Sequence, residues 1–364
     1  MELSIVQLLA ATVERGGSDL HLCAGSQPMV RIQGLMVPLL DTVLDTDACR
    51  ALVYSCFTEI QRERFEQTLE LDFALTVANL GRFRSNAHLN RGAVEAAFRH
   101  IPDEVPSLDK LGLPPIIKRL CSAERGLILV TGITGSGKTT TLAAMIQEIN
   151  STRSGIIITI EDPIEYLFSH KLCRIKQREI GSDTRSFPNA LHHVMRQDPD
   201  VILVSDLTDY QTISAALTAA ETGRLVLAPL HTVDAPRTID RLVDAFPADQ
   251  QGQSVAQLAN SLLAIVTQRL LPRADGIGRI PCVEVMLMNE GVRACIRDRR
   301  FQPILSMIEL GGKEGMITFD ESVSSLFAQG LISRDTALGN ARDPNRIQAI
   351  KPAAPAKKGL FGKG

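Results

Sequence analysis

The chain has 364 residues, of which 45% are hydrophobic and 22% are charged. This composition is typical of a globular protein with about two domains, and it excludes collagen, a coiled coil or disorder as a description of the whole chain. Lysine and arginine number 39 against 41 aspartates and glutamates, which argues against general nucleic-acid binding, and the 4% of aromatic residues argues against base-stacking surfaces.

A small α+β domain is predicted over residues 1–103. Apolar residues recur at helical spacing over 5–13, residues 28–34 are typical of a strand that enters a turn, and residues 48–65 have helical spacing. Strands that complete a small sheet are expected over three further segments: 72–77, 82–89 and 93–99.

A linker, a larger domain and a tail are predicted after the first domain. Pro102 and Pro106 interrupt regular structure, and we place the linker at 104–113. The larger domain is expected over 114–345. The stretch rich in alanine, proline and lysine over 346–364 predicts a disordered tail, whose lysines either contact a membrane or stay solvated.

The sequence shows no targeting signal and no zinc-binding cysteine pattern. Its start, MELSIVQLLAATVERGG, has neither the basic region nor the cleavage site of a signal peptide, and no segment has the ~20 apolar residues that a membrane helix needs. The seven cysteines include no CxxC pair. We therefore expect a cytoplasmic protein with reduced cysteines.

Near-continuous apolar segments alternate with helical stretches in the larger domain. The segments are 127–130, 156–160, 201–204 and 225–227. Strands of this kind, separated by helices, are typical of a largely parallel sheet that is covered on both faces. From about residue 260 the chain is expected to be mostly helical. The predicted fold class is therefore α/β, preceded by the small α+β domain.

The strongest motif is the phosphate loop GITGSGKT, from Gly132 to Thr139. It follows an apolar strand and precedes a helix, as the pattern GxxxxGK[ST] requires. Backbone N–H groups and the helix N-terminus favour phosphate, Lys138 reaches the β- and γ-phosphates, and the Thr139 hydroxyl binds Mg²⁺. ATP and Mg²⁺ are the predicted cofactors, and the predicted nucleotide-binding residues are Gly132, Thr134, Gly135, Ser136, Gly137, Lys138, Thr139 and Thr140.

Several further segments resemble the type II/IV secretion ATPases. Residues 159–165, TIEDPIE, resemble the acidic box of that family, residues 198–204 resemble its Walker B strand, and residues 220–232 resemble its His box. Ser18-Asp19-Leu20-His21 and Arg82-Phe83-Arg84-Ser85-Asn86 resemble its amino-terminal domain. The resemblance covers about residues 3–340, and it is strongest to the type IV pilus retraction ATPases of the PilT/PilU branch, because neither a long amino-terminal extension nor a tetracysteine insertion is present.

The resemblance implies a hexameric ring of chains. Each chain would have a PAS-like amino-terminal domain and a RecA-like ATPase domain with a helical C-terminal part. The implied partners are copies of the chain, alone or with a paralogous retraction ATPase, and an inner-membrane platform protein of the pilus. Contact with the membrane would run only through these partners, at the cytoplasmic side, and nucleic acid is not an expected partner.

The resemblance also implies roles for individual residues. Glu161 corresponds to the carboxylate that orients or deprotonates water, Asp206 to the Walker B acid that helps to hold Mg²⁺, and His231 to the sensor of the γ-phosphate. Arg84 and Arg99 correspond to arginines that face the nucleotide, with Arg196 a weaker candidate. Each residue also has a structural alternative, as a salt-bridged loop acid, a satisfied histidine or a solvated surface arginine.

Two family motifs are altered in this chain. The family's Walker B run Gly-Glu-Met-Arg-Asp is replaced by Ser205-Asp206-Leu207-Thr208-Asp209, so the acid is one methylene shorter. In the His box, Arg224 replaces a histidine and Pro229 removes a backbone donor. Arg224 is expected to contact phosphate or a neighbouring acid, or to have no role.

Residues 291–298 retain Arg293, Ile296 and Arg297 of a motif that matters for pilus retraction, although an amphipathic basic helix explains them equally. The leading functional hypothesis is an ATP-hydrolysing pilus motor. A subunit that binds ATP but hydrolyses little, accessory to an active ring, is the alternative, and a RecA-like DNA motor is a third hypothesis that the charge balance opposes.

Overall fold

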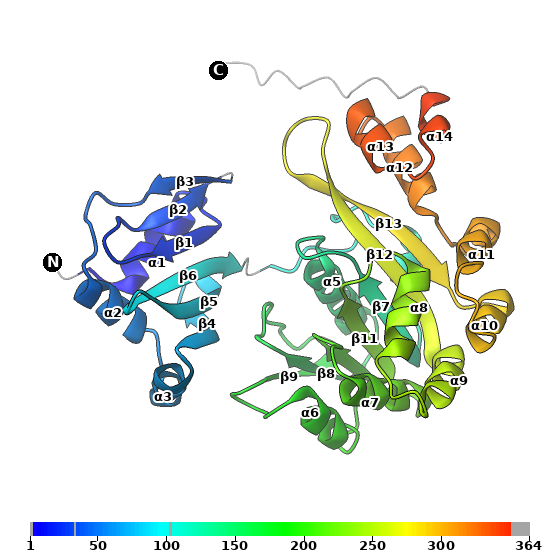
Figure 1. The fold of residues 1–364 in the computed structure, drawn as a ribbon, viewed down its shortest axis with the longest axis horizontal. Coiled ribbons are helices and arrows are strands. Elements are labelled where there is room, and N and C mark those ends of the chain that lie inside the picture. The colour runs from blue at the N-terminus through cyan, green and yellow to red at the C-terminus, as the bar shows by residue number, and fades with distance from the viewer. Residues whose placement is uncertain (1–2, 33, 102–103, 351–364) are drawn as a thin grey trace. The chain divides into compact units, whose positions relative to one another are not determined.

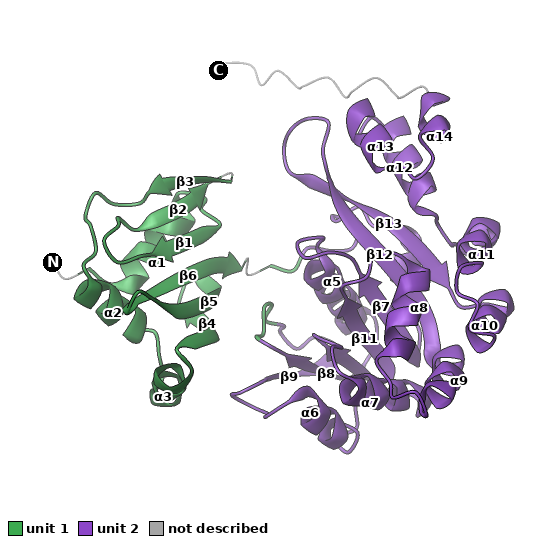
Figure 2. Cartoon of the chain, in the orientation of Figure 1, with its two compact units in different colours: residues 1–105, 163–167 green, residues 106–162, 168–364 purple. Residues whose placement is uncertain are grey.

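The structure is a computed structural model that describes residues 3–32, 34–101 and 104–350. The chain divides into two compact units, coloured separately in Figure 2, and the overall ribbon is drawn in Figure 1. The first unit comprises residues 1–105 together with 163–167, and the second comprises 106–162 and 168–364. The lysine-containing tail over 351–364, for which we predicted disorder, lies outside the described residues.

The first unit contains an antiparallel six-stranded sheet in the order β3-β2-β1-β6-β5-β4. Its elements are α1 (Ile5–Glu14), β1 (Asp19–Leu22), β2 (Met29–Ile32), β3 (Leu35–Pro38), α2 (Thr46–Tyr54), α3 (Glu59–Thr68), β4 (Glu70–Val77), β5 (Gly81–Asn90) and β6 (Ala93–Ile101). The predicted α+β composition is thereby confirmed, whereas the likeness to a PAS domain stays a prediction.

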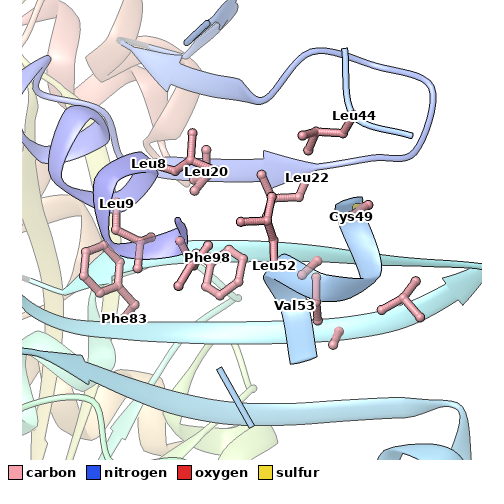
Figure 3. Close-up of a cluster of buried hydrophobic side chains, with 14 of the residues drawn as sticks. Leu8, Leu9, Leu20, Leu22, Leu44, Cys49, Leu52, Val53, Phe83 and Phe98 are labelled. Carbon is pink, nitrogen blue, oxygen red and sulfur yellow. The ribbon is translucent and has the colours of Figure 1, made fainter. Parts of the chain in front are cut away.

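One face of this sheet forms the core of the first unit. Leu8 and Leu9 of α1 and Leu52 of α2 belong to the same buried cluster as Leu20 of β1 and Phe98 of β6 (Figure 3). Because successive side chains of a strand point to opposite faces, the residues between these core positions are turned to the other face. That second face carries polar and charged side chains.

The helical spacing over 48–65 belongs to two helices, α2 and α3, which are separated by a short turn. Thr58 caps the start of α3: its hydroxyl accepts from the Gln61 N–H at 3.3 Å, and the Gln61 side chain accepts from the Thr58 N–H at 3.0 Å. Such a reciprocal cap satisfies backbone donors that a continuous helix would otherwise use, so it favours a new helix start.

The second unit is built on a seven-stranded sheet in the order β13-β12-β7-β11-β10-β8-β9. All neighbouring pairs are parallel except β12 with β13, which confirms the predicted parallel sheet. The strands are β7 (Gly126–Thr131), β8 (Gly155–Glu161), β9 (Cys173–Glu179), β10 (Val201–Val204), β11 (Leu225–Leu230), β12 (Leu262–Pro272) and β13 (Arg279–Leu287).

Helices cover both faces of this sheet, as Figure 1 illustrates. Helix α5 (Lys138–Thr152) leads from β7 towards β8, whereas α6 (Phe187–Val194), α7 (Tyr210–Glu221), α8 (Ala235–Asp244) and α9 (Gln251–Ser261) lie in connections that run across the sheet in the opposite direction. Right-handed crossovers of opposite direction place their helices on opposite faces. In agreement, α7 contacts α6 and α9, and α8 contacts α9.

The expectation of a mostly helical segment after residue 260 is wrong for its first part. Residues 262–272 and 279–287 form the hairpin β12–β13, and β12 pairs with β7 in the centre of the domain. Leu262–Val266 is continuously apolar, and so short a run does not distinguish a buried helix from a strand that is buried on both faces. The pairing partner, β7, decides between them.

The last part of the described chain is helical, as predicted. It contains α10 (Glu290–Arg297), α11 (Ile304–Leu310), the 3₁₀ helix Gly311–Glu314, α12 (Phe319–Ala328), α13 (Arg334–Asn340) and α14 (Pro344–Gln348). One further helix, α4 (Pro115–Leu120), precedes the first strand of the domain. Ordered structure extends past the boundary predicted at 345, because Ile347 is fully buried in the cluster around α12. Among the described residues, no helix has the length and apolarity that crossing a membrane requires.

Candidate nucleotide-binding and hydrolysis site

The phosphate loop connects the fully buried strand β7 to helix α5. Gly137 occupies the position before the helix with φ 87°, and Gly132 has φ 143°, so both require the backbone freedom of glycine. The first helical residue is Lys138, which places the positive end of the helix dipole at the loop. The backbone therefore has the form that the sequence motif predicts.

Packing against β12 is a second reason for two of these glycines. A Cβ at Gly132 would lie 2.3 Å from the carbonyl oxygen of Gln268, and a Cβ at Gly137 would lie 2.8 Å from its side-chain nitrogen. At Gly135 the same position is open. The loop thus packs closely against β12 at Gly132 and at Gly137, whereas no other atom of the described residues lies close to the Cβ position of Gly135 between them.

Lys138 is held inside the loop. Its Nζ donates to the carbonyl oxygens of Gly132 at 2.8 Å and Ile133 at 3.0 Å, and it lies 3.4 Å from Nδ1 of His231. The residue is 8% exposed, and burial lowers the pKa of its ammonium. A buried cation with only neutral partners is energetically costly, which favours an anionic ligand at this position.

The other predicted site residues of the second unit follow neighbouring parallel strands. β7 leads to the phosphate loop, β11 ends beside His231, β10 ends shortly before Asp206, and β8 ends with Glu161. Because the carboxyl ends of parallel strands share one edge of the sheet, the structure gathers these groups where α/β sheets bind ligands. The order of the strands places His231 between the loop and Asp206.

Glu161 is 5% exposed and bonded to its own sheet. Its Oε1 accepts from the Thr159 hydroxyl at 2.6 Å and from Nε2 of Gln177 at 3.1 Å. Two donors of this kind fix the orientation of the carboxyl group. Thr159 is the first residue of the acidic motif that pointed to Glu161, whereas Gln177 of β9 lies outside that motif.

Asp206 lies in partly buried surroundings at the end of β10. Burial raises the pKa of its carboxyl group, while the N–H of Leu207 and the nearby His231 act in the opposite direction. The preceding Ser205 accepts at its hydroxyl from the Asp162 N–H at 3.1 Å, so the turn after β10 is tied to the turn after β8.

Arg224 lies at the opposite end of β11 from His231. Its carbonyl oxygen accepts from Gly126 at the start of β7, and its guanidinium donates to the Thr222 carbonyl at 2.7 Å. With β11 spanning Leu225–Leu230, about 20 Å of strand separate Arg224 from the phosphate loop. A contact between Arg224 and phosphate bound by the same chain, one of the expected alternatives, is therefore wrong.

Pro229 does belong to the loop's edge of the sheet, inside β11. The pairing of β10 with β11 ends at Leu227, and Pro229 pairs with Val130 of β7. Its missing N–H therefore falls beyond the β10 ladder, a position where a strand tolerates proline.

Arg84 and Arg99 lie opposite each other on β5 and β6 of the first unit. Arg99 pairs with Asp19 at 2.8 Å, and Arg84 pairs with Glu165 of the segment 163–167 at 3.0 Å. Burial acts to raise the pKa of Asp19, but the Ser18 hydroxyl and Arg99 outweigh it and hold that pKa low. These acids offset the repulsion between two like charges on adjacent strands.

The exposure of the remaining loop residues decides which of them could contact ATP or Mg²⁺. Thr134, Gly135 and Thr139 are exposed, Thr140 is partly exposed and Ser136 is buried. The described residues contain no group of three or more His, Cys, Asp or Glu side chains that could hold a metal ion by themselves. Mg²⁺ in nucleotide sites commonly takes one or two protein oxygens besides phosphates and water, so an exposed Thr139 hydroxyl and the Asp206 carboxylate fit that donor set.

A largely parallel sheet with a phosphate loop after its interior strand β7 defines a P-loop ATPase of the RecA-like class. The family model described as "Type II/IV secretion system protein" matches residues 99–302. PilT, the type IV pilus retraction ATPase of Pseudomonas aeruginosa, is 44% identical over 95% of this chain and 100% of its own length. The type IV pilus ATPase PilU of the same organism is 39% identical over 94% and 90%.

A solved structure agrees with the sequence comparisons. The crystal structure of the pilus retraction motor PilT with bound ADP is 43% identical, has a TM-score of 0.88 and covers 96% of this chain and 100% of that one. The chain therefore belongs to the type II/IV secretion ATPases, in the branch of the type IV pilus retraction ATPases.

Sequence reasoning overlooked one buried residue that touches the phosphate loop. Gln268 of β12 bonds to both the loop and α5, although it follows the loop by more than a hundred residues. The signal in the sequence is weak: Gln268 lies in a polar triplet, Thr267-Gln268-Arg269, between apolar residues, and buried polar side chains need partners.

Proposed function

We propose that this chain is an ATP-driven motor subunit of a type IV pilus retraction machine. The phosphate loop would hold the phosphates, with Lys138 exchanging the carbonyls of Gly132 and Ile133 for phosphate oxygens. Thr139 and Asp206 would hold Mg²⁺, which when bound neutralises phosphate charge. The observation that carries the proposal is the gathering of Lys138, His231, Asp206 and Glu161 at one edge of a parallel sheet.

The residues then divide the work of hydrolysis. Glu161, oriented by Thr159 and Gln177, would position or deprotonate the attacking water. His231, beside Lys138, would sense the terminal phosphate. Arg84 and Arg99 would stabilise the charge that develops on the transferred phosphoryl group, once it replaces their carboxylate partners Glu165 and Asp19.

We further propose the assembly in which this chemistry does work. Copies of the chain, alone or with a paralogous retraction ATPase, would form a six-membered ring on the cytoplasmic side of the inner membrane. Its membrane contact would run through a platform protein of the pilus. The similarity to PilT and PilU over nearly their whole lengths supports this assembly.

Steady-state phosphate release tests the proposed function. The unaltered chain should release phosphate from ATP at a rate at least about 100-fold above that of Lys138→Ala, because this lysine is the buried cation of the loop. Equal rates for the two proteins would overturn the motor proposal. Binding of a fluorescent ADP analogue, measured on both proteins, separates a loss of binding from a loss of turnover.

A second candidate is a subunit that binds ATP, hydrolyses little and accompanies an active ring. The observation in its favour is Asp206, whose shorter side chain stands in the Walker B position in partly buried surroundings. This chain would then bind the ADP analogue well and release phosphate no faster than Lys138→Ala does.

A further inference from the structure

The side-chain amide of Gln268 ties strand β12 to the phosphate loop. Its Nε2 donates to the carbonyl oxygen of Ser136 at 2.7 Å, and its Oε1 accepts from the Thr141 hydroxyl at 2.8 Å. Gln268 is 2% exposed and Thr141 is 1% exposed, so neither bond competes with water. One amide group therefore bonds both to Ser136 in the loop and to Thr141 in the first turn of α5.

The same residue limits how far the loop can move towards the sheet. The Gln268 backbone carbonyl lies against Gly132, and its side-chain nitrogen lies against Gly137, each within 3 Å of where a Cβ would be. The two ends of the loop, Gly132 and Gly137, thus both pack against one residue of β12, Gln268. A shift of Gln268 would move both ends at once.

The bond to Ser136 determines the direction of a neighbouring N–H group. In a planar trans peptide the C=O and the following N–H point in opposite directions. Because the Ser136 carbonyl points to Gln268, the Gly137 N–H points away from β12. The N–H groups of such a loop, directed to one side, are what binds a phosphate.

We propose that Gln268 is a positioning residue of the nucleotide site, which holds the Ser136–Gly137 peptide in the orientation that binds phosphate. The inference rests on the proposed function, since it assigns the loop a phosphate ligand. A side-chain amide of this length supplies the donor for Ser136 and the acceptor for Thr141 at once, whereas a carboxylate or a thioether supplies at most the acceptor. The residue acts through the loop and need not touch the nucleotide.

Three variants separate the two bonds. Gln268→Glu keeps the acceptor for Thr141 but places a carboxylate against the Ser136 carbonyl, and Gln268→Met removes both bonds at similar volume. Thr141→Val removes only the bond to α5. We expect the Kd of a fluorescent ADP analogue to rise about 10-fold or more in Gln268→Glu, less in Gln268→Met and least in Thr141→Val.

A matched control comes from the adjacent position. Thr267 is 1% exposed, and its hydroxyl bonds to that of Thr131 on β7 at 2.9 Å, again between β12 and β7. Thr267→Val removes a buried polar bond of the same strand pair without touching residues 132–141. It should lower the melting temperature as the other variants do, while its Kd stays within about 2-fold of the unaltered protein.

The pH dependence distinguishes positioning from mere destabilisation. A protonated carboxyl group in Gln268→Glu can donate to the Ser136 carbonyl again, so its Kd relative to the unaltered protein should recover as the pH falls from 8 to 6. Gln268→Met has no group that titrates, and its relative Kd should stay constant over the same range.

Hydrogen exchange without nucleotide provides a readout that does not depend on the proposed function. Amides of residues 132–140 should exchange at least about 10-fold faster in Gln268→Met than in Thr267→Val. Unchanged exchange and unchanged Kd in the Gln268 variants would overturn the inference. If the unaltered chain bound no nucleotide, the proposed function would fall, and the exchange rates alone would still decide whether Gln268 holds the loop.

Discussion

The side chain of Asp206 lies just after β10, near His231 and partly withdrawn from water. Burial raises the pKa of this carboxyl group, so its ionised form has a less favourable environment than that of a surface aspartate. The resemblance to the family implies a glutamate at this position, and the missing methylene withdraws the carboxylate by about 1 Å, a displacement that can cost about 100-fold in rate.

Asp206→Glu should therefore raise kcat for ATP hydrolysis by about 10-fold or more and leave KM within about 2-fold. Phosphate release at saturating ATP measures the change. Arg224→His is the matched control, because Arg224 lies at the far end of β11 and should leave the rate unaltered. An unchanged kcat in Asp206→Glu would show that the shorter acid does not limit hydrolysis.

At the scale of elements, three segments meet at Glu284 of β13. Its Oε1 accepts from the Ala235 N–H at the start of α8, and its Oε2 lies 3.1 Å from the Arg342 guanidinium, which follows α13. Glu284 is 1% exposed, and burial raises the pKa of its carboxyl group, against the effect of Arg342. This ion pair joins the C-terminal helices to the helix that follows His231.

Arg342→Ala should destabilise the second unit by about 2 kcal/mol, less than the ~3–5 kcal/mol of a fully buried pair because Arg342 is partly exposed. Without the cation the folded-state pKa of Glu284 rises further above its unfolded value. The loss of stability therefore grows as the pH rises from the unfolded-state pKa of Glu284 to its folded-state pKa, and it is smallest at low pH, where Glu284 is protonated.

Melting temperatures of Arg342→Ala and the unaltered chain, compared at pH 5.5 and pH 8, measure this effect. The double variant Arg342→Ala with Glu284→Gln should be compared with Glu284→Gln alone: neither protein has a titrating group at position 284, so the deficit between them should be the same at both pH values. A single variant whose deficit shrinks at the higher pH would contradict the assignment of Glu284 as the titrating group.

At the scale of the whole molecule, the proposed ring makes each subunit's turnover depend on its neighbours. When Lys138→Ala subunits are mixed with unaltered subunits in equal amounts and allowed to exchange, phosphate release should fall well below half. The same mixture prepared without time for exchange is the control. A release rate that falls in proportion to the unaltered fraction would show that the sites work independently.

The sequence by itself determined the chemistry of the loop and the class of the larger domain. Gly132, Gly137 and Lys138 are readable because each is required by local backbone geometry or by the charge of the ligand. The strands β7, β8, β10 and β11 are readable because parallel strands buried on both faces leave continuous apolar runs. Apolar spacing does not show where α2 ends and α3 begins, because the reciprocal cap between Thr58 and Gln61 sets that boundary.

Only the tertiary structure decided which distant residues meet. β12 begins with a short apolar run, Leu262–Val266, that has no distinguishing period. Its pairing with β7, and with it the place of Gln268 beside the loop, therefore depends on contacts far apart in sequence. Arg224 and His231 are close in the sequence, yet a strand lies between them and separates them by about 20 Å. Local patterns fix which groups can bind phosphate, whereas the order and direction of strands fix which groups are present to do so.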